Sequence, residues 1–278
     1  MKPAISLRSV SKRFRLRFNR GQSLKSRFVG LFHARYREES QPFWALRDVS
    51  LSVEPGEAVG VIGPNGSGKT TLVNLITRFV KPTSGKVLYK GSPIHHLPPH
   101  KIVRLGIART FQMVRPFYQL PAYKNMIIPL YSPRAKGLVG GRFGDRDAMA
   151  LDLLEEVGFE RDAFVAYKPA GALPQGYLKR LELAKAIALQ PDLVILDELF
   201  SGLSLAEVAS IVPIIEKMRI QGKTIIMIEH RLRELFRIAD RVIVMNYGSK
   251  IADGPPNSVM EDDAVKCAYL GSETDSGD

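Results

Sequence analysis

A glycine-rich turn that ends in a lysine and a threonine is the part of the sequence whose chemistry is clearest. It consists of Gly63, Pro64, Asn65, Gly66, Ser67, Gly68, Lys69 and Thr70. Glycines let the backbone curl so that successive N–H groups point at phosphate oxygens, and a helix predicted from Thr71 onward adds its N-terminal dipole. We therefore expect this segment to bind a nucleoside triphosphate. Lys69 would reach the β and γ phosphates, and the Thr70 hydroxyl would ligate Mg²⁺.

Two carboxylates stand together at the end of a predicted buried strand. The strand is rich in leucine and β-branched residues, and Asp197 and Glu198 close it. An acid at the end of a parallel strand beside a phosphate loop can hold Mg²⁺ through water, and this role falls to Asp197. Glu198 would orient and deprotonate an attacking water. The alternative, two solvated acids at a strand end, loses weight beside a phosphate loop.

An imidazole and an amide complete the candidate set. His230 follows the predicted strand 224–228, where it can sense the γ phosphate. Gln112 carries an amide that can meet Mg²⁺ or its water. On chemistry alone, a loop histidine is more often structural and a glutamine is usually a surface residue.

Alternating strand and helix signals must position these side chains. Strands are predicted at 58–62, 193–197, 224–228 and 242–245. Because helical segments separate them, we expect a mainly parallel sheet wrapped by helices. An antiparallel edge is expected from 5–10 and 49–53. Helices are expected within 113–189, notably at 148–157, and at 257–270.

Composition narrows the class of protein. At 278 residues and 45% hydrophobic content the chain can bury a large core. Its longest apolar runs fall well short of the ~20 residues that span a bilayer, and its start lacks a signal-peptide hydrophobic region, so we expect a cytoplasmic protein. The single cysteine, Cys267, excludes an internal disulfide and a cysteine-based zinc site.

The net charge of +12 is concentrated near the N-terminus, where no acidic residue occurs between Arg8 and Arg37. Charge alone does not choose among nucleic acid, an acidic membrane surface and an acidic protein as partner. Apolar residues recur here at helical spacing, which permits an amphipathic basic helix against anionic headgroups or a membrane subunit; they are Leu24, Phe28 and Leu31. A helix that packs this stripe on its own domain is an equal alternative.

In their order along the chain these motifs resemble the nucleotide-binding subunit of an ATP-binding cassette (ABC) transporter, from about residue 5 to 271. The signature-like segment is Leu173, Pro174, Gln175, Gly176 and Tyr177. The resemblance makes Asp197 the Walker B aspartate and His230 the switch histidine. It also implies a dimer in which two subunits sandwich two ATP molecules, each signature segment contacting the γ phosphate held by the opposite loop.

The chain departs from the family pattern where that contact is made. Pro174 replaces the usual serine and removes a hydroxyl and a backbone donor, and Tyr177 replaces the usual glutamine. Leu199 and Ser204 replace a proline and an aspartate. Gly176 and the helix after it still offer N–H groups and a dipole, so we expect an altered contact. These departures bear on turnover more than on nucleotide binding.

Several stretches resemble the ATPases of branched-chain amino acid importers, a group that tolerates proline in the signature; they are 106–112, 179–184, 228–230 and 268–271. The ATPase of lipopolysaccharide transport shares some of these sequence segments. The basic insert at about 15–42 and the residues that follow it instead resemble ATPases of polysaccharide exporters. Phe14, Phe43 or Trp44 would stack on adenine.

The resemblance implies an α/β protein with the P-loop NTPase ABC ATPase fold: a mainly parallel core sheet, an antiparallel edge subdomain and a helical lobe. We expect one nucleotide-binding domain at 1–271, its lobe at about 113–189, and a disordered acidic tail at 272–278. The expected function is ATP hydrolysis that powers a branched-chain amino acid-type importer. A polysaccharide or lipid exporter ATPase and a soluble or regulatory cassette of low turnover are the alternatives.

The expected partners follow from the same resemblance. They are a second cassette subunit, identical or paralogous, and transmembrane permease subunits on which the lobe docks. This places the chain peripherally on the inner face of the cell membrane. Cassette ATPases that act on DNA or ribosomes usually carry two cassettes or long inserted coils, so no nucleic acid partner is expected.

Overall fold

A six-stranded sheet forms the centre of the molecule. The computed structural model describes residues 2–18, 39–137, 145–160 and 164–270. The strand order is β10-β9-β3-β8-β7-β6. The strands are β3 (Ala58–Ile62), β6 (Ile107–Arg109), β7 (Leu193–Asp197), β8 (Thr224–Ile228), β9 (Arg241–Asn246) and β10 (Ser249–Gly254). All neighbours pair in parallel except β9 and β10, so the predicted mainly parallel sheet is confirmed.

The apolar composition of the central strands reflects burial on both faces. Leu193 and Ile195 of β7 join one hydrophobic cluster with the N-terminal strands, whereas Val194 and Leu196 join a second cluster with the helices. Because successive side chains of a strand point to opposite faces, a strand covered on both sides must be apolar throughout. Every residue of β3, β7 and β8 is buried.

A second, antiparallel sheet has the order β2-β1-β4-β5. Its strands are β1 (Ile5–Phe18), β2 (Glu39–Val53), β4 (Ser84–Tyr89) and β5 (Ser92–Pro93). The expected edge strands 5–10 and 49–53 are found, but both are longer than predicted. The pairing of β1 with β2 continues as far as Phe18 and Glu39, so the two ends of the predicted insert prolong the ladder. The residues proposed for a basic helix, and the tail from 271, lie outside the described residues.

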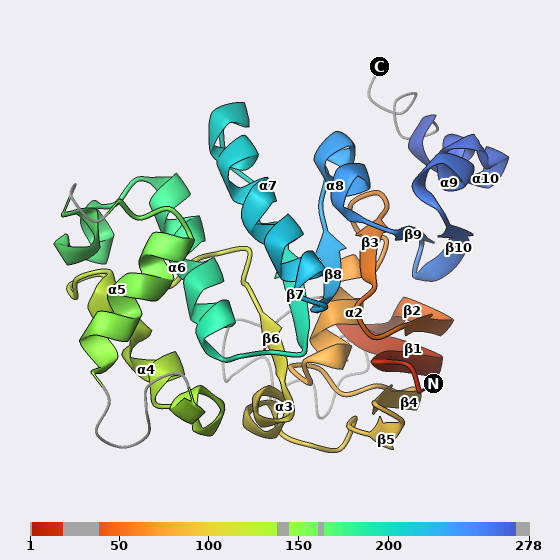
Figure 1. Cartoon of the computed structure of the whole chain (residues 1–278). Coiled ribbons are helices and arrows are strands. Elements are labelled where there is room, and N and C mark those ends of the chain that lie inside the picture. Colours follow the sequence, from red (N-terminus) through yellow and green to blue (C-terminus); the bar gives the residue numbers. More distant parts are fainter. Residues whose placement is uncertain (1, 19–38, 138–144, 161–163, 271–278) are drawn as a thin grey trace.

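Helices surround the central sheet and gather beyond its β6 edge. Figure 1 shows α4 (Ile127–Leu130), α5 (Arg146–Glu156) and α6 (Gln175–Ala188) together on one side, opposite the N-terminal strands. Four further helices are α2 (Lys69–Ile76), α3 (Pro99–Leu105), α7 (Leu205–Ile220) and α8 (Leu232–Ile238). Helix α5 begins at Arg146, before the predicted start at 148, because the Asp145 carboxylate accepts the N–H groups of Asp147 and Ala148. In the described part of the chain, none of the helices has the length and apolar character needed to cross a bilayer.

The single helix predicted at 257–270 is wrong. Two helices occupy this segment, α9 (Pro256–Glu261) and α10 (Asp263–Leu270). Asp262 has an extended backbone, and its carboxylate accepts the N–H of Ala264 at 2.8 Å. Aspartate competes in this way with helical hydrogen bonding and favours helix starts, so it divides the segment.

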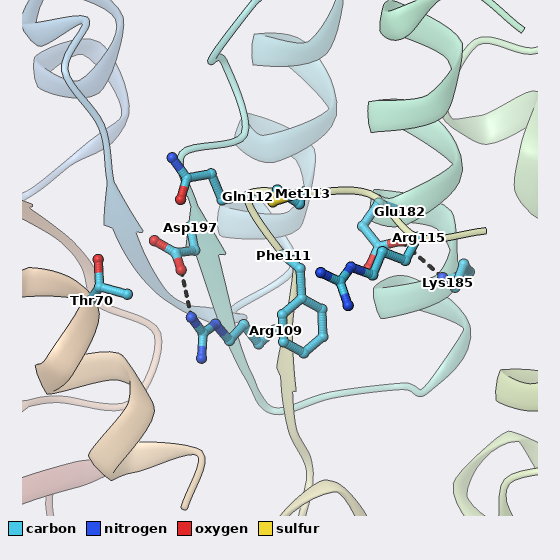
Figure 2. A pocket seen from close by; sticks show the side chains of 9 residues that line it. All are labelled: Thr70, Arg109, Phe111, Gln112, Met113, Arg115, Glu182, Lys185 and Asp197. Carbon is cyan, nitrogen blue, oxygen red and sulfur yellow. Dashed lines mark hydrogen bonds and ion pairs between the residues drawn. The ribbon is translucent and has the colours of Figure 1, made fainter. Parts of the chain in front are cut away.

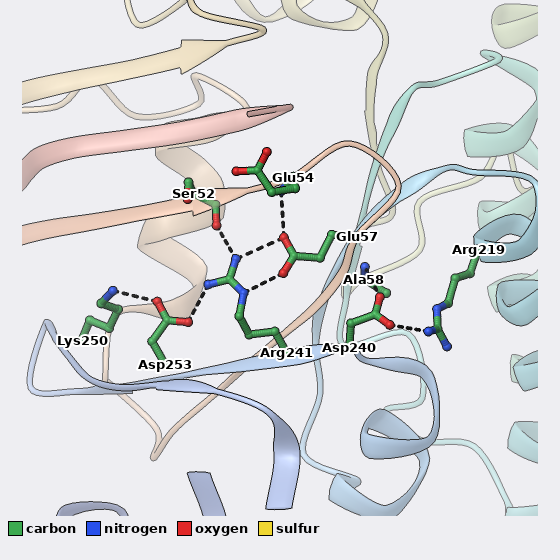
Figure 3. Close-up of polar contacts among 9 residues, drawn as sticks. All are labelled: Ser52, Glu54, Glu57, Ala58, Arg219, Asp240, Arg241, Lys250 and Asp253. Carbon is green, nitrogen blue, oxygen red and sulfur yellow. Dashed lines mark hydrogen bonds and ion pairs between the residues drawn. The ribbon is translucent and has the colours of Figure 1, made fainter. Parts of the chain in front are cut away.

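One arginine connects the two sheets. The guanidinium of Arg241 on β9 donates to Glu57 Oε1 at 2.6 Å, to Asp253 Oδ1 at 2.5 Å and to the Ser52 carbonyl at the end of β2 (Figure 3). The hydrogen bonds to Glu57 hold the pKa of Arg241 above its ordinary value. The Arg241 side chain is 24% exposed and that of Glu57 is 17% exposed, so water screens the network weakly.

Replacing Arg241 by methionine should lower the free energy of unfolding by about 3 kcal/mol, because Glu57 loses its cation and the Ser52 carbonyl loses its donor in a poorly hydrated place, while Asp253 keeps Lys250. Chemical unfolding monitored by circular dichroism measures the loss. Arg237→Met is the matched control, since Arg237 binds Glu216 through two hydrogen bonds but its side chain is 64% exposed. That control should lose less than about 1 kcal/mol. Equal losses would contradict this account of the network.

Candidate nucleotide site

The glycine-rich turn is held against the sheet from two sides. It leaves the end of β3 and leads into α2. Gly63 has a φ of 148°, and a Cβ there would lie 2.1 Å from the Met245 carbonyl oxygen, so only glycine fits. The amide of Gly248, in the turn between β9 and β10, donates to the Ser67 carbonyl at 3.0 Å. The loop is therefore shaped by the strand neighbours of β3 as well as by its own sequence.

The polar groups of this loop suit a polyphosphate. The Lys69 ammonium is buried and donates to the carbonyls of Gly63 at 2.7 Å and Pro64 at 2.9 Å. Burial lowers its pKa, while the charges of Glu198 and Asp197 act in the opposite direction. The buried Ser67 hydroxyl has no hydrogen-bond partner in the described chain, and α2 has neither a side-chain cap nor an acid in its first turn. A phosphate oxygen would satisfy these donors.

The two carboxylates at the end of β7, those of Asp197 and Glu198, have different surroundings. Asp197 is 2% exposed, and its Oδ2 accepts from Arg109 Nη2 at 2.6 Å. Glu198 has a φ of 49°, which is uncommon for a residue with a side chain. Its N–H donates to the Ile228 carbonyl at 2.9 Å, which holds this turn against the end of β8. The chain thus leaves the sheet sharply at Glu198.

The structure brings the three predicted catalytic side chains together. Gln112 Nε2 donates to Glu198 Oε2 at 2.5 Å, and His230 Nε2 lies 3.6 Å from Glu198 Oε1. The Glu198 side chain is 15% exposed and that of His230 is 51% exposed, so one carboxylate stands between an amide and a solvent-facing imidazole. This arrangement can hold a water molecule and accept its proton. The individual roles stay predictions.

The predicted metal ligands line one cleft of about 440 Å³ (Figure 2). Thr70 contributes a hydroxyl, Gln112 an amide and Asp197 a carboxylate, and these are the oxygen donors that Mg²⁺ prefers. Within the described ranges no group of three or more His, Cys, Asp or Glu side chains is arranged for a metal ion. Three such oxygen donors fit an ion whose remaining ligands would be phosphate oxygens and water.

Sequence reasoning did not single out two basic residues at this site. Arg109 on β6 binds Asp197 and also donates to Asn74 Oδ1 of α2 at 2.7 Å, with the rings of Phe79 and Phe111 beside its guanidinium. Lys179 on α6 is only 1% exposed. Arg109 stands directly before the Thr110-Phe111-Gln112 segment, but its carboxylate partner is 88 residues away in sequence. No local pattern reveals such a pair.

The signature-like segment precedes and opens α6. Pro174 stands at the cap position without a side-chain cap, and Leu173 is buried. The Tyr177 ring packs on Phe159 with centroids 5.1 Å apart, so this side chain faces the protein. Gln175 is the first residue of the helix.

An anion of the same chain already lies at the start of α6. A Cβ added to Gly176 would lie 2.3 Å from Glu207 Oε1. Glu207 belongs to the capping box of α7, and hydrogen bonds from Ser204 are the main cause of its lowered pKa, with a smaller contribution from the Gly176 amide. The predicted contact of Gly176 with a second subunit's nucleotide stays a prediction, and Glu207 would compete for the same amide.

The aromatic candidates for adenine stacking divide between two faces of the β1–β2 ladder. Phe14 pairs with Phe43, and Arg13 pairs with Trp44. Directly opposite residues of an antiparallel pair share a face, so Trp44 lies on the face opposite to Phe14. The Lys12 ammonium lies 4.8 Å from the Phe14 ring centroid and the Arg13 guanidinium 5.4 Å from that of Trp44. An adenine on one face can meet only one of these two predicted residues.

Comparison with known proteins agrees with this geometry. A family model described as "ABC transporter" matches residues 46–201, from the second strand through the loop after Glu198. The chain belongs to the ABC transporter family. As a member it binds and hydrolyses ATP, and the predicted family, fold and enzyme class are confirmed.

Curated ABC relatives cover about four fifths of the chain. The high-affinity branched-chain amino acid transport ATP-binding protein BraF of Pseudomonas aeruginosa is 36% identical over 237 residues, covering 82% of this chain and 92% of the relative. The lipopolysaccharide export system ATP-binding protein LptB of Haemophilus influenzae is 34% identical, covering 82% and 91%. A solved nucleotide-free ATP-binding cassette from an ABC transporter superposes with a TM-score of 0.74 at 27% identity, covering 97% of this chain and 99% of that one.

Glu229, directly before His230, is buried beside the predicted catalytic residues. It is 3% exposed, and its Oε1 accepts the Phe200 N–H at 2.8 Å. Burial raises its pKa from 4.5 to about 7, against the effect of the Phe200 hydrogen bond and the Lys179 charge. Folding therefore favours the protonated carboxyl group.

Because the folded-state pKa of Glu229 is the higher one, its contribution to stability should fall as the pH rises from about 4.5 to about 7. Glu229→Gln should remove this fall, worth about 1–3 kcal/mol, so the variant should gain stability relative to wild type at pH 7.5 but not at pH 4.5. Unfolding in urea across this range measures it. Glu261→Gln, at an exposed position, should follow wild type. Parallel curves for Glu229→Gln and wild type would contradict the raised pKa.

Proposed function

We propose that the chain powers the uptake of branched-chain amino acids as the ATPase subunit of an ABC importer. The proposed cargo is supported by curated relatives from bacteria and an archaeon. These relatives are named for branched-chain amino acid transport and are 33% to 36% identical to this chain. BraF, LivG of Escherichia coli and LivG of Archaeoglobus fulgidus are each matched over at least 90% of their length. The export protein LptB is similar to a comparable degree, so the cargo needs a direct test.

The proposed chemistry centres on Glu198. Lys69 and the loop amides hold the β and γ phosphates, and the Gln112 amide and Glu198 orient a water molecule in line with the γ phosphorus. Glu198 accepts a proton as the water oxygen bonds to phosphorus and the bond to the β-phosphate oxygen breaks, leaving ADP and phosphate. His230 contacts the γ phosphate. Mg²⁺ held by Thr70, Asp197 and Gln112 would neutralise charge on the phosphates.

We also propose that two such cassettes act as a pair. Solved cassettes that share this fold include dimeric ones, one of them in a post-hydrolysis state with ADP and phosphate. In the proposed pair, Leu173 to Tyr177 of one subunit face the nucleotide on the other. Glu207 beside the Gly176 amide would weaken this contact by repelling the γ phosphate.

Exposed apolar side chains support the proposed docking of the helical lobe on a permease at the inner face of the membrane. Ile128 is 64% exposed and Tyr131 is 65% exposed on and beside α4, and Met113, next to Gln112, is 68% exposed. Large exposed apolar side chains are favourable contacts for a partner protein. Met113 lines the cleft that contains Gln112, so a permease that contacts Met113 would be in reach of the proposed catalytic residues. Contact of the basic insert with anionic lipid stays a prediction.

Glu198→Gln should lower kcat for ATP hydrolysis by at least about 10²-fold, because the amide cannot accept the proton. The ATP Kd should change by less than about twofold, since the loop that binds the phosphates is intact. Steady-state turnover and fluorescent-nucleotide binding measure the two quantities. Glu160→Gln changes an exposed carboxylate and should leave both unchanged. Unaltered turnover of Glu198→Gln would show that another group is the base.

The transport proposal is tested by capture of the tagged Glu198→Gln chain with ATP from detergent-solubilised membranes of its native host. We expect polytopic permease subunits and a solute-binding protein by mass spectrometry. Uptake of labelled leucine should be lost in cells that carry Glu198→Gln and retained with Glu160→Gln. Recovery of an exporter-type membrane subunit with glycan or lipid enzymes would contradict the proposed cargo. Recovery of ribosomal or DNA-bound proteins alone would contradict the proposed role in transport.

A further inference from the structure

Lys179 is a buried lysine whose ammonium ends between two catalytic segments. It lies on α6, one turn after Gln175, and only 1% of it is exposed. Its Nζ donates to the Gln112 carbonyl at 2.9 Å and to the Glu198 carbonyl at 3.1 Å. One cation therefore holds the main chain of both residues.

A lysine is a costly choice for this position. Burial of the ammonium lowers the pKa of Lys179, opposed by the charges of Glu229, Glu198, Glu182 and Asp197. A methionine would fill a similar volume without any desolvation cost. The hydrogen bonds to two loop carbonyls are what an apolar side chain cannot supply, and each carbonyl would otherwise lose this partner in a partly buried place.

The two carbonyls belong to the residues whose side chains also bond to each other. Gln112 Nε2 and Glu198 Oε2 are 2.5 Å apart, so the pair is joined through its side chains and again through Lys179. Gln112 follows β6, Glu198 follows β7, and Lys179 belongs to a helix of the lobe. Any displacement of α6 along its axis would pull on both catalytic segments.

We propose that Lys179 is a positioning residue that fixes the Gln112–Glu198 pair in its hydrolytic geometry and links that geometry to the placement of α6. The proposal rests on the proposed roles of Glu198 and Gln112. It assigns Lys179 no contact with nucleotide. Loss of the ammonium should therefore change the rate of the chemical step and leave nucleotide affinity alone.

Lys179→Met tests this directly. The kcat should fall by about 10-fold to 10²-fold, the loss expected when a catalytic group is displaced by about 1 Å. The ATP Kd should stay within about twofold. Lys179→Arg keeps the charge and the donors and should retain most of the turnover. If Lys179→Met does not fold, Lys179→Gln keeps a shorter donor and should show the same split between kcat and Kd.

A matched control separates positioning from general stabilisation. Arg134→Met removes another basic residue that donates to main-chain carbonyls, those of Gln190 at 2.5 Å and Leu189 at 3.3 Å, just beyond the end of α6 and away from the catalytic pair. It should lower the Tm with kcat unchanged. In the Glu198→Gln background, Lys179→Met should cause no further loss, because both changes act through the same carboxylate.

Hydrogen exchange supplies a readout that does not need turnover. In nucleotide-free protein, Lys179→Met should accelerate exchange in the segments 110–113 and 197–200 by about 10-fold, with β3 unchanged. Unchanged kcat in Lys179→Met, or a further loss of kcat in the Glu198→Gln background, would overturn the proposal. If wild type shows no Glu198-dependent turnover, the proposed function fails instead, and the exchange measurement still decides whether Lys179 holds the two segments.

Discussion

The arrangement of the predicted catalytic residues depends on the register between parallel neighbouring strands. The order β3-β8-β7 places the phosphate loop, the His230 segment and the Glu198 segment at adjacent strand ends. Asp197 pairs with Ile228, and the Glu198 N–H then donates to the Ile228 carbonyl. Because this last bond lies just beyond the ladder, both chains turn away from the sheet at the same level. A shift of one residue would reverse the face to which every side chain of the strand points and separate Glu198 from His230.

The buried ionisable groups of the site depend on one another electrostatically. Lys69, Lys179, Asp197 and Glu229 are each at most 5% exposed, so none of them is well solvated. Arg109 neutralises Asp197 directly, whereas the two lysines and Glu229 rely on carbonyls, amides and one another's fields. Removing the charge of Lys69, Lys179 or Asp197 leaves its neighbours uncompensated, whereas folding favours the neutral form of Glu229. Substitutions here should consequently combine non-additively, whereas those in the distant Arg241 network should not couple to them.

Local patterns were sufficient where a short segment sets its own structure. The sequence predicts β3, β7, β8 and the glycine-rich turn correctly. Burial on both faces of a strand requires a continuous apolar run, and the curvature of the turn requires closely spaced glycines, so both depend on residues that are adjacent in sequence. Partners far apart in sequence cannot be predicted in this way: nothing near Arg109 points to Asp197, and nothing near Gly176 points to Glu207. The single helix predicted at 257–270 is wrong because the carboxylate of Asp262 caps the second helix, so this one residue divides the segment. The length of β1 and β2 was also missed, since each strand extends only because the other pairs with it.

The left-handed backbone at Glu198 lowers the stability of the fold, whereas the side chain at this position has a role in the proposed reaction. A residue with a side chain at φ 49° costs conformational energy that glycine does not incur. Glycine at this position would relieve the strain while removing the carboxylate. Random mutagenesis selected for thermal resistance alone would thus favour loss of the carboxylate at position 198, and selection for ATP hydrolysis would keep it if Glu198 has the proposed role.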